Sequence, residues 1–258
     1  MKKTTSKINA IFVIGTIILT ACSPKEAPVT DQVAAVKADT TEIAETPQTT
    51  PVVIKKALGI DVSHFQGAVN WEEIKANNIT FAYTKATQGH TYTDTKFHQN
   101  WSEMSTAGIA KGAYHFYSTE SDGKTQAEHF INTIGEVKIG DMPPVLDLEQ
   151  GGINGTVDVK LFQQEVMSWL KAVEAKFGVK PMIYTNNPFA NKYLDNEQFA
   201  EYTLWIAEYG VEEAKTPLTW KDKGWAIWQR TERGNIEGEI GNVDHDITNM
   251  ALHELLVK

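Results

Sequence analysis

The 258-residue chain has a single cysteine, Cys22, so it can form neither an intramolecular disulfide nor a cysteine-based metal site. Basic residues are in the minority, with 24 Lys and Arg against 33 Asp and Glu and a formal net charge of −9. Nucleic-acid binding rewards clustered Lys and Arg, so we expect no nucleic-acid partner. Hydrophobic residues at 41% and charged residues at 22% are instead typical of a globular protein with a buried core.

Several common functional motifs are also absent. The chain has no P-loop, no G-x-G-x-x-G, no H-E-x-x-H and no G-x-S-x-G. Phosphoryl transfer, dinucleotide binding, zinc proteolysis and serine hydrolysis therefore lose their usual support. The histidines follow no tight metal-binding spacing, so we expect neither a metal nor a cofactor.

Residues 1–22 have the pattern of a secretory signal. Lys2, Lys3 and Lys7 precede an apolar stretch over residues 8–20, which is too short for a membrane-spanning helix. The stretch ends in Leu-Thr-Ala-Cys at residues 19–22, which resembles a bacterial lipobox with Cys22 as the acylated residue. The alternative is a free cysteine after an ordinary signal peptide.

A lipobox implies a membrane-anchored lipoprotein of the cell envelope. Two or three acyl chains would anchor it firmly, since each buried CH₂ contributes roughly 0.8 kcal/mol. In a Gram-negative cell, Ser23 after the cysteine resembles the signal for the outer membrane, facing the periplasm. Residues 23–55 are rich in Pro, Thr, Ala and Glu and lack aromatics, which predicts a disordered tether. Residues 56–258 form the predicted folded domain.

Short apolar runs recur in this domain, and the early ones alternate with helical patterns. Candidate strands cover residues 58–63, 80–85, 112–117, 144–149, 182–185, 204–207, 226–229 and 242–247, and candidate helices cover 71–76, 96–107, 124–134 and 157–177. Eight strands alternating with helices predict an α/β fold, an irregular (β/α)8-like TIM-type barrel with short late connections. An open doubly wound sheet fits the alternation nearly as well.

Acidic residues lie at the predicted strand ends. Asp147 and Glu149 are two residues apart, so they share one face of the fourth strand at its carboxyl end. Two close carboxylates disfavour double ionisation, and one can then keep a proton for a glycosidic oxygen. A pair of solvated acids is the simpler interpretation of this motif alone. Asp61 in the first strand and Asp244 in the eighth would join the pair at one barrel mouth, because these strands are neighbours in a closed barrel.

Aromatic and histidine side chains gather at the same strand ends. Among them are Tyr83, Tyr114, Tyr184, Trp205 and Trp228. Each of these residues taken singly suits a core position, but those beside the acids would offer flat faces on which sugar rings stack. We interpret His64 and His115 as hydrogen-bonding residues that line the cleft.

Taken together, these motifs resemble glycoside hydrolase family 25, the Chalaropsis-type lysozymes. The matching segments are DVSHFQG at 61–67, FAYTKATQGHTYTD at 81–94, GAYHF at 112–116, DLE at 147–149, IY at 183–184, LWIA at 204–207, WQ at 228–229 and GNVD at 241–244. The resemblance implies an irregular (β/α) barrel that hydrolyses the β-1,4 bond between N-acetylmuramic acid and N-acetylglucosamine. It also implies that Glu149 is the general acid, Asp147 its partner, and Asp61 and Asp244 the other acids of the cleft.

We expect the aromatic residues named above, His115 and Gln229 to bind the substrate, peptidoglycan glycan strands to be the partner, and the protein to be a monomer. Gln88 departs from the family pattern, where Glu is usual, and Arg230 stands where Tyr is common. The alternative function is a non-catalytic glycan-binding lipoprotein on the same fold, against which the intact acids argue. The attacking group stays open between water, a carboxylate and the substrate's own N-acetyl group.

Overall fold

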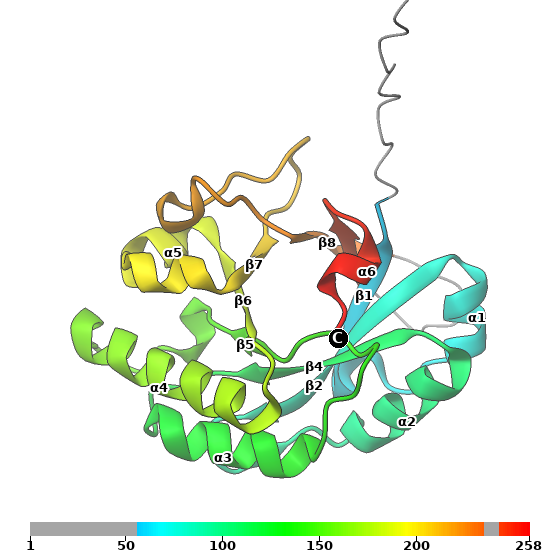
Figure 1. Ribbon diagram of the computed structural model, residues 1–258, viewed down its shortest axis with the longest axis horizontal. Coiled ribbons are helices and arrows are strands. Elements are labelled where there is room, and N and C mark those ends of the chain that lie inside the picture. The colour runs from blue at the N-terminus through cyan, green and yellow to red at the C-terminus, as the bar shows by residue number, and fades with distance from the viewer. Residues whose placement is uncertain (1–55, 235–242) are drawn as a thin grey trace, which may run out of the picture. The chain divides into compact units, whose positions relative to one another are not determined.

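The computed structural model describes residues 56–234 and 243–258. The predicted signal peptide, Cys22, the tether and Asn242 lie outside these residues. Figure 1 shows the strands at the centre, with helices α2 (Phe97–Ala107), α3 (Gly123–Ile134) and α4 (Val159–Phe177) along one side. The strands are β1 (Leu58–Val62), β2 (Ile79–Gln88), β3 (Tyr92–Thr93), β4 (Ala110–Phe116), β5 (Val145–Asp147), β6 (Met182–Asn186), β7 (Thr203–Ala207), β8 (Ile227–Gly234) and β9 (Val243–Thr248).

The sheet closes on itself through β1. This strand pairs in parallel with β2 and antiparallel with β9, while β4, β5, β6, β7 and β8 follow β2 in order. Strand β3 pairs only with the end of β2 and stands outside the ring. The remaining eight strands form the predicted closed barrel, and the closure excludes the open sheet.

The last strand of the barrel runs in the opposite direction from the others. β9 is antiparallel to both of its neighbours, β8 and β1, whereas all other neighbouring pairs around the ring are parallel. Asp244 therefore lies near the start of its strand, and not at the carboxyl end as in an all-parallel barrel. Because the strand is reversed, its start reaches the same mouth as the carboxyl ends of the other strands.

The six described helices are α1 (Trp71–Ala76), α2 (Phe97–Ala107), α3 (Gly123–Ile134), α4 (Val159–Phe177), α5 (Asn187–Tyr193) and α6 (Leu252–Leu255). Four of the six, α1, α3, α4 and α5, begin at an Asn or Asp whose side chain accepts a hydrogen bond from the first turn. The Asp158 side chain accepts hydrogen bonds from the first turn of α4, and Gly178 ends that helix in the left-handed conformation. After β6 the connections contain only short helical segments, including the 3-10 turns η3 (Glu197–Glu201) and η4 (Leu218–Trp220), so the barrel is irregular as predicted.

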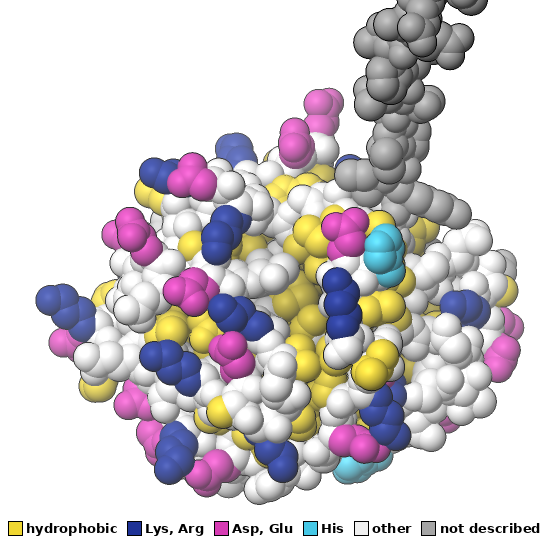
Figure 2. All heavy atoms as spheres, in the orientation of Figure 1, with side chains coloured by type: hydrophobic (Ala, Val, Ile, Leu, Met, Phe, Trp, Pro, Cys, Tyr) yellow, Lys and Arg dark blue, Asp and Glu magenta, His cyan; other side chains and the backbone are white. Residues whose placement is uncertain are grey.

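Three apolar clusters hold the barrel together. One fills the space between the sheet and helices α3 and α4, with Phe130 and Trp169 fully buried. A second fills the barrel interior around Tyr83 and Trp205, and a third lies beneath α1 and α2. On the face in Figure 2, acidic and basic side chains are interspersed around a central area of exposed hydrophobic atoms.

The beginning and end of the described domain meet at the barrel floor, opposite the mouth. The backbone N–H of Ala57 donates to the Thr248 hydroxyl at 2.9 Å. Helix α6 adds Leu255 to the apolar cluster of the interior, and Val257 donates its N–H to the Asp141 carbonyl at 2.9 Å. The floor is therefore closed by the last residues of the chain. In the part of the chain that the structure describes, no helix combines the length and apolar character needed to traverse a bilayer.

Candidate active site

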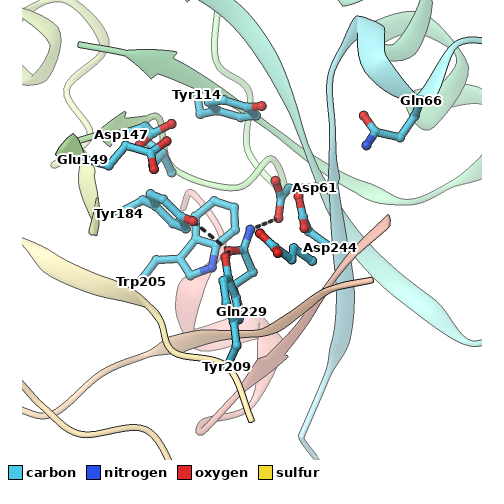
Figure 3. A pocket seen from close by; sticks show the side chains of 12 residues that line it. Asp61, Gln66, Tyr114, Asp147, Glu149, Tyr184, Trp205, Tyr209, Gln229 and Asp244 are labelled. Carbon is cyan, nitrogen blue, oxygen red and sulfur yellow. Dashed lines mark hydrogen bonds between the residues drawn. The ribbon is translucent and has the colours of Figure 1, made fainter. Parts of the chain in front are cut away.

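A pocket of about 410 Å³ opens at the barrel mouth. Its lining residues come from seven barrel strands and the loops that follow them (Figure 3): Asp61, Gln66, Tyr114, Val145, Asp147, Glu149, Tyr184, Trp205, Tyr209, Gln229, Glu232 and Asp244. All four predicted acids are present. Figure 3 shows them as two groups, with Asp147 and Glu149 on one side and Asp61 and Asp244 on the other.

The first group lies where β5 ends. The strand is shorter than predicted and stops at Asp147, but Glu149 continues in extended conformation at φ −145° and ψ 171°, so both carboxylates face the pocket. One oxygen of Asp147, Oδ1, is buried without a hydrogen-bond partner among the described residues. Burial and the Glu149 charge raise the pKa of Asp147 well above its ordinary range. Burial also raises the pKa of Glu149, against the opposing charge of Lys85.

The second group joins β1 to β9. Asp61 and Asp244 are register partners in the antiparallel ladder, and their side chains share a hydrogen bond. Burial raises the pKa of Asp61 well above its ordinary range, and the Asp244 and Asp246 charges add to this effect. Burial likewise raises the pKa of Asp244 to about 6. Asp246 is buried beneath them and accepts a hydrogen bond from Trp205 Nε1 at 2.9 Å.

Gln229 links this second group to two tyrosines. Its amide Nε2 donates to Asp61 Oδ2 at 2.7 Å, and its Oε1 accepts from the Tyr184 hydroxyl at 2.7 Å. The Tyr209 hydroxyl donates to the same oxygen. The amide is thereby fixed with its nitrogen towards the carboxylate and its oxygen towards the hydroxyls. Tyr184 and Tyr209 also have raised pKa values, chiefly through burial, so they remain neutral donors.

Four of the seven predicted substrate-binding residues line the pocket: Tyr114, Tyr184, Trp205 and Gln229. Tyr83 does not, because it lies deeper in the barrel interior, where its hydroxyl donates to the Pro143 carbonyl at 3.1 Å. Trp228 does not line the pocket either. Its Nε1 donates to the Glu208 carbonyl at 2.7 Å, and its ring packs against Trp225 outside the barrel.

His115 is the clearest correction to the predicted site. Its ring is fully buried between the sheet and the helices, stacked on Trp169 with 5.5 Å between centroids. Nδ1 lies 2.7 Å from the Thr87 hydroxyl and Nε2 lies 3.1 Å from Gln126 Oε1. Burial lowers the pKa of His115 to about 3, so the ring is neutral. It holds helix α3 on the sheet and does not line the cleft.

His64 is also outside the set of lining residues, although it lies close to the mouth. Its Nδ1 is 2.7 Å from Asp94 Oδ2, and its backbone N–H donates to the same oxygen at 3.1 Å. This arrangement fixes the loop after β1, from which Gln66 reaches the pocket.

Sequence reasoning missed four lining residues: Gln66, Val145, Tyr209 and Glu232. Gln66 lies within a quoted motif, and Val145 has the same strand parity as Asp147. Tyr209 and Glu232 lie beyond the predicted ends of their strands. Extending the alternation from Trp205 would have found Tyr209. Glu232 has the opposite parity to Gln229, and the ladder register shifts after Gln229, which simple alternation does not predict.

The chemistry available at this mouth is proton transfer. Buried carboxylates with raised pKa values face a pocket lined by tyrosine hydroxyls and an indole ring, which suits a polar ring with several hydroxyl groups. Within residues 56–234 and 243–258, no cluster of three or more His, Cys, Asp or Glu side chains is arranged to hold a metal ion.

Comparisons with known proteins agree with this geometry. The model of the family "Glycosyl hydrolases family 25" matches residues 60–239. Lysozyme M1 of Streptomyces globisporus is 32% identical over 77% of this chain and 69% of its own length. The N,O-diacetylmuramidase of Chalaropsis sp is 29% identical over 74% of this chain and 96% of its own.

Solved structures show the same barrel. The bacterial lysozyme from Streptomyces coelicolor superposes with a TM-score of 0.73 at 30% identity, covering 77% of this chain and 94% of that one. The family GH25 lysozyme from Aspergillus fumigatus gives 0.70 at 27% identity, covering 79% and 100%. With its closed barrel, its acidic mouth and a family match across most of the domain, the chain belongs to glycosyl hydrolase family 25 and is a glycoside hydrolase of the lysozyme type.

Proposed function

We propose that the protein is a muramidase that hydrolyses the β-1,4 bond between N-acetylmuramic acid and N-acetylglucosamine in peptidoglycan, with Glu149 as general acid. The observation that carries this proposal is the Asp147–Glu149 pair, which faces the pocket with both pKa values raised by burial. The printed names of the relatives, a lysozyme and a diacetylmuramidase, support the substrate class.

The two members of the pair differ in their surroundings. Asp147 is 6% exposed, whereas Glu149 is partly exposed to the pocket. Close carboxylates hold one proton between them, and they titrate as a pair. Glu149 is better placed to deliver that proton to the oxygen of the leaving sugar. Asp147, once ionised, stabilises positive charge that develops on the sugar ring.

The Asp61–Asp244 group faces the pocket from the side opposite Asp147 and Glu149. Asp61 and Asp244 share a hydrogen bond, and Gln229 orients Asp61 through its amide. We assign to these two carboxylates the positioning of polar groups of the substrate and stabilisation of its developing charge. A substrate ring in the pocket would lie between the two acidic groups (Figure 3).

The test uses purified peptidoglycan and mass analysis of the released muropeptides. Glu149→Gln keeps the side-chain shape and removes the transferable proton, so turnover should fall by roughly 10²- to 10⁴-fold while the fold survives. Glu128→Gln, on the exposed face of α3, is the matched control and should retain wild-type turnover. Folded Glu149→Gln with near wild-type turnover would show that another group is the acid. A folded wild-type protein that binds glycan without releasing muropeptides would instead indicate the non-catalytic alternative.

Asp147→Asn tests the pairing. Removal of the neighbouring negative charge lowers the pKa of Glu149, so the pH at which Glu149 loses its proton should fall. Turnover should also decrease, because the variant lacks the charge assigned to Asp147. A pH–rate profile, with circular dichroism as the check on folding, measures both effects.

We also propose that the enzyme works at the cell envelope, held to a membrane through Cys22. The lipobox pattern at residues 19–22 and the tether composition of residues 23–55 support this location. Peptidoglycan lies in the same compartment, so the location and the proposed substrate agree.

A further inference from the structure

Lys85 is a buried cation at the edge of the acidic mouth. It extends from β2 and is 8% exposed, and its strand neighbour in β4 is the pocket residue Tyr114. Its Nζ lies 4.7 Å from the centroid of the Phe116 ring, and Phe116 is the register partner of Asp147. Strand pairing thus places the ammonium group two strands away from the Asp147–Glu149 pair, on the same side of the barrel.

The hydrogen-bond partner of Lys85 is neutral. Nζ donates to Gln88 Oε1 at 2.7 Å, and Lys85 takes part in no ion pair among the described residues. Lys111 provides the contrast on the neighbouring strand. It is similarly buried, but its Nζ lies 3.1 Å from Asp141 Oδ1, which neutralises it locally. The positive charge of Lys85 therefore acts on more distant carboxylates.

We propose that Lys85, held in place by the uncharged side chain of Gln88, is a positioning residue that controls the ionisation of the Asp147–Glu149 pair, so that Gln88 sets the pH range in which the enzyme works. The proposal rests on the proposed function, because it concerns the same general acid. Neither residue lines the pocket, so the effect acts through charge and not through contact with the substrate.

The charges around these groups are consistent with this role. The Lys85 charge opposes the rise in the pKa of both Asp147 and Glu149 that burial causes. Burial lowers the pKa of Lys85 itself, and the charges of Asp147, Asp94 and Glu149 oppose this effect. The other titratable groups close to Lys85 or the pair are Tyr92, Tyr114, Tyr184 and Asp244, and the His115 ring lies on the opposite face of β4.

The decisive variant is Gln88→Glu, which keeps Lys85 and places a carboxylate on its ammonium group. The charge on Lys85 is then neutralised, so Glu149 should keep its proton to higher pH. We compare the proteins one pH unit above the midpoint of the wild-type alkaline limb. There, kcat/KM divided by its value at the pH optimum should be about threefold or more higher in Gln88→Glu than in the wild type. Lys85→Met should move the limb in the same direction and further, and Lys85→Arg, which keeps the charge, should leave the limb near its wild-type position.

Lys111→Met is the matched control for loss of a buried lysine. It should lower the melting temperature without moving the limb, because the Lys111 charge is paired with Asp141. The overturning result is an alkaline limb that stays in place, or moves to lower pH, in folded Gln88→Glu. Gln88→Glu keeps the Lys85 side chain, so it tests the proposal even if Lys85→Met does not fold.

A second measurement separates this inference from the proposed function. Carboxyl ¹³C resonances of labelled Asp and Glu, with Glu149 assigned by comparison with Glu149→Gln, report ionisation without any turnover. If the wild type proves inactive on peptidoglycan, the proposed function fails, and the ¹³C titration still tests Lys85 and Gln88. If the wild type is active and the Glu149 titration is the same in Gln88→Glu, this inference alone is wrong.

Discussion

Replacing Asp244 by Asn should make the protein more stable at neutral pH while impairing its activity. Burial raises the pKa of Asp244 from its ordinary 3.8 to about 6. Between these values the folded protein holds a proton that the unfolded chain has released. Stability therefore falls as pH rises from about 4 to 6, and above pH 6 the full cost is present.

The magnitude follows from the difference between 3.8 and about 6, which corresponds to about 3 kcal/mol at roughly 1.4 kcal/mol per pH unit. Asp244 is partly exposed, so solvent screening reduces this to about 2 kcal/mol. Asn avoids the cost of ionisation and can still hydrogen-bond to Asp61. At pH 8 we expect Asp244→Asn to melt about 4 to 8 °C above the wild type, with little difference at pH 4.

The assay is thermal and urea denaturation of both proteins at pH 4, 6 and 8. Asp122→Ala is the control with the opposite pH dependence. The Asp122 carboxylate caps α3 and accepts from Thr125 N–H at 2.8 Å, which lowers its pKa. Its loss should cost about 1 kcal/mol at neutral pH, and this cost should diminish in acid as the carboxylate protonates. A gain for Asp244→Asn that is the same at pH 4 and pH 8, or a loss at pH 8, would refute the reasoning.

Three further predictions concern the rest of the chain. Cys22→Ala should abolish acylation and leave unprocessed precursor; normal processing and unchanged detergent partitioning would contradict the lipoprotein proposal. Deletion of residues 23–50 should leave activity on soluble glycan fragments intact but reduce cleavage of intact wall by cells, and a large loss on the soluble fragments would show that this segment supports the domain. Gly112→Ala should destabilise the barrel by about 1 to 3 kcal/mol in urea denaturation, because the added Cβ would lie 2.1 Å from the Tyr83 ring; an unchanged midpoint would mean that the ring moves freely.

The barrel strands were predictable because each apolar run identifies a strand locally, without knowledge of the strands that pair with it. All eight predicted runs are barrel strands, and the helix at residues 71–76 has the predicted bounds. The direction of β9 was not predictable in this way, since alternation of apolar and polar residues reads the same in both directions. Asp244 nevertheless reaches the mouth, because reversing the strand also exchanges its ends.

The errors in the predicted site come from side-chain direction and depth. Neighbouring residues in a strand point to opposite faces, so His115 next to Tyr114, and Trp228 next to Gln229, face away from the pocket. Tyr83 has an inward direction but lies too deep, and depth depends on how the strands are staggered around the ring. Stagger is a property of the closed barrel and leaves no mark in a single strand's sequence.

The pairing of β1 has a mechanical consequence. The described domain starts at the barrel floor, and its first strand is hydrogen-bonded along both edges, to β2 and to β9. A pull on Lys56 directed away from the mouth would load both ladders in shear, so that many hydrogen bonds resist it together and do not open one after another. The pocket lies at the opposite end of the barrel, so this force would not be transmitted through it. A force applied at Lys56 would therefore pass into the sheet through β1 and its two neighbours.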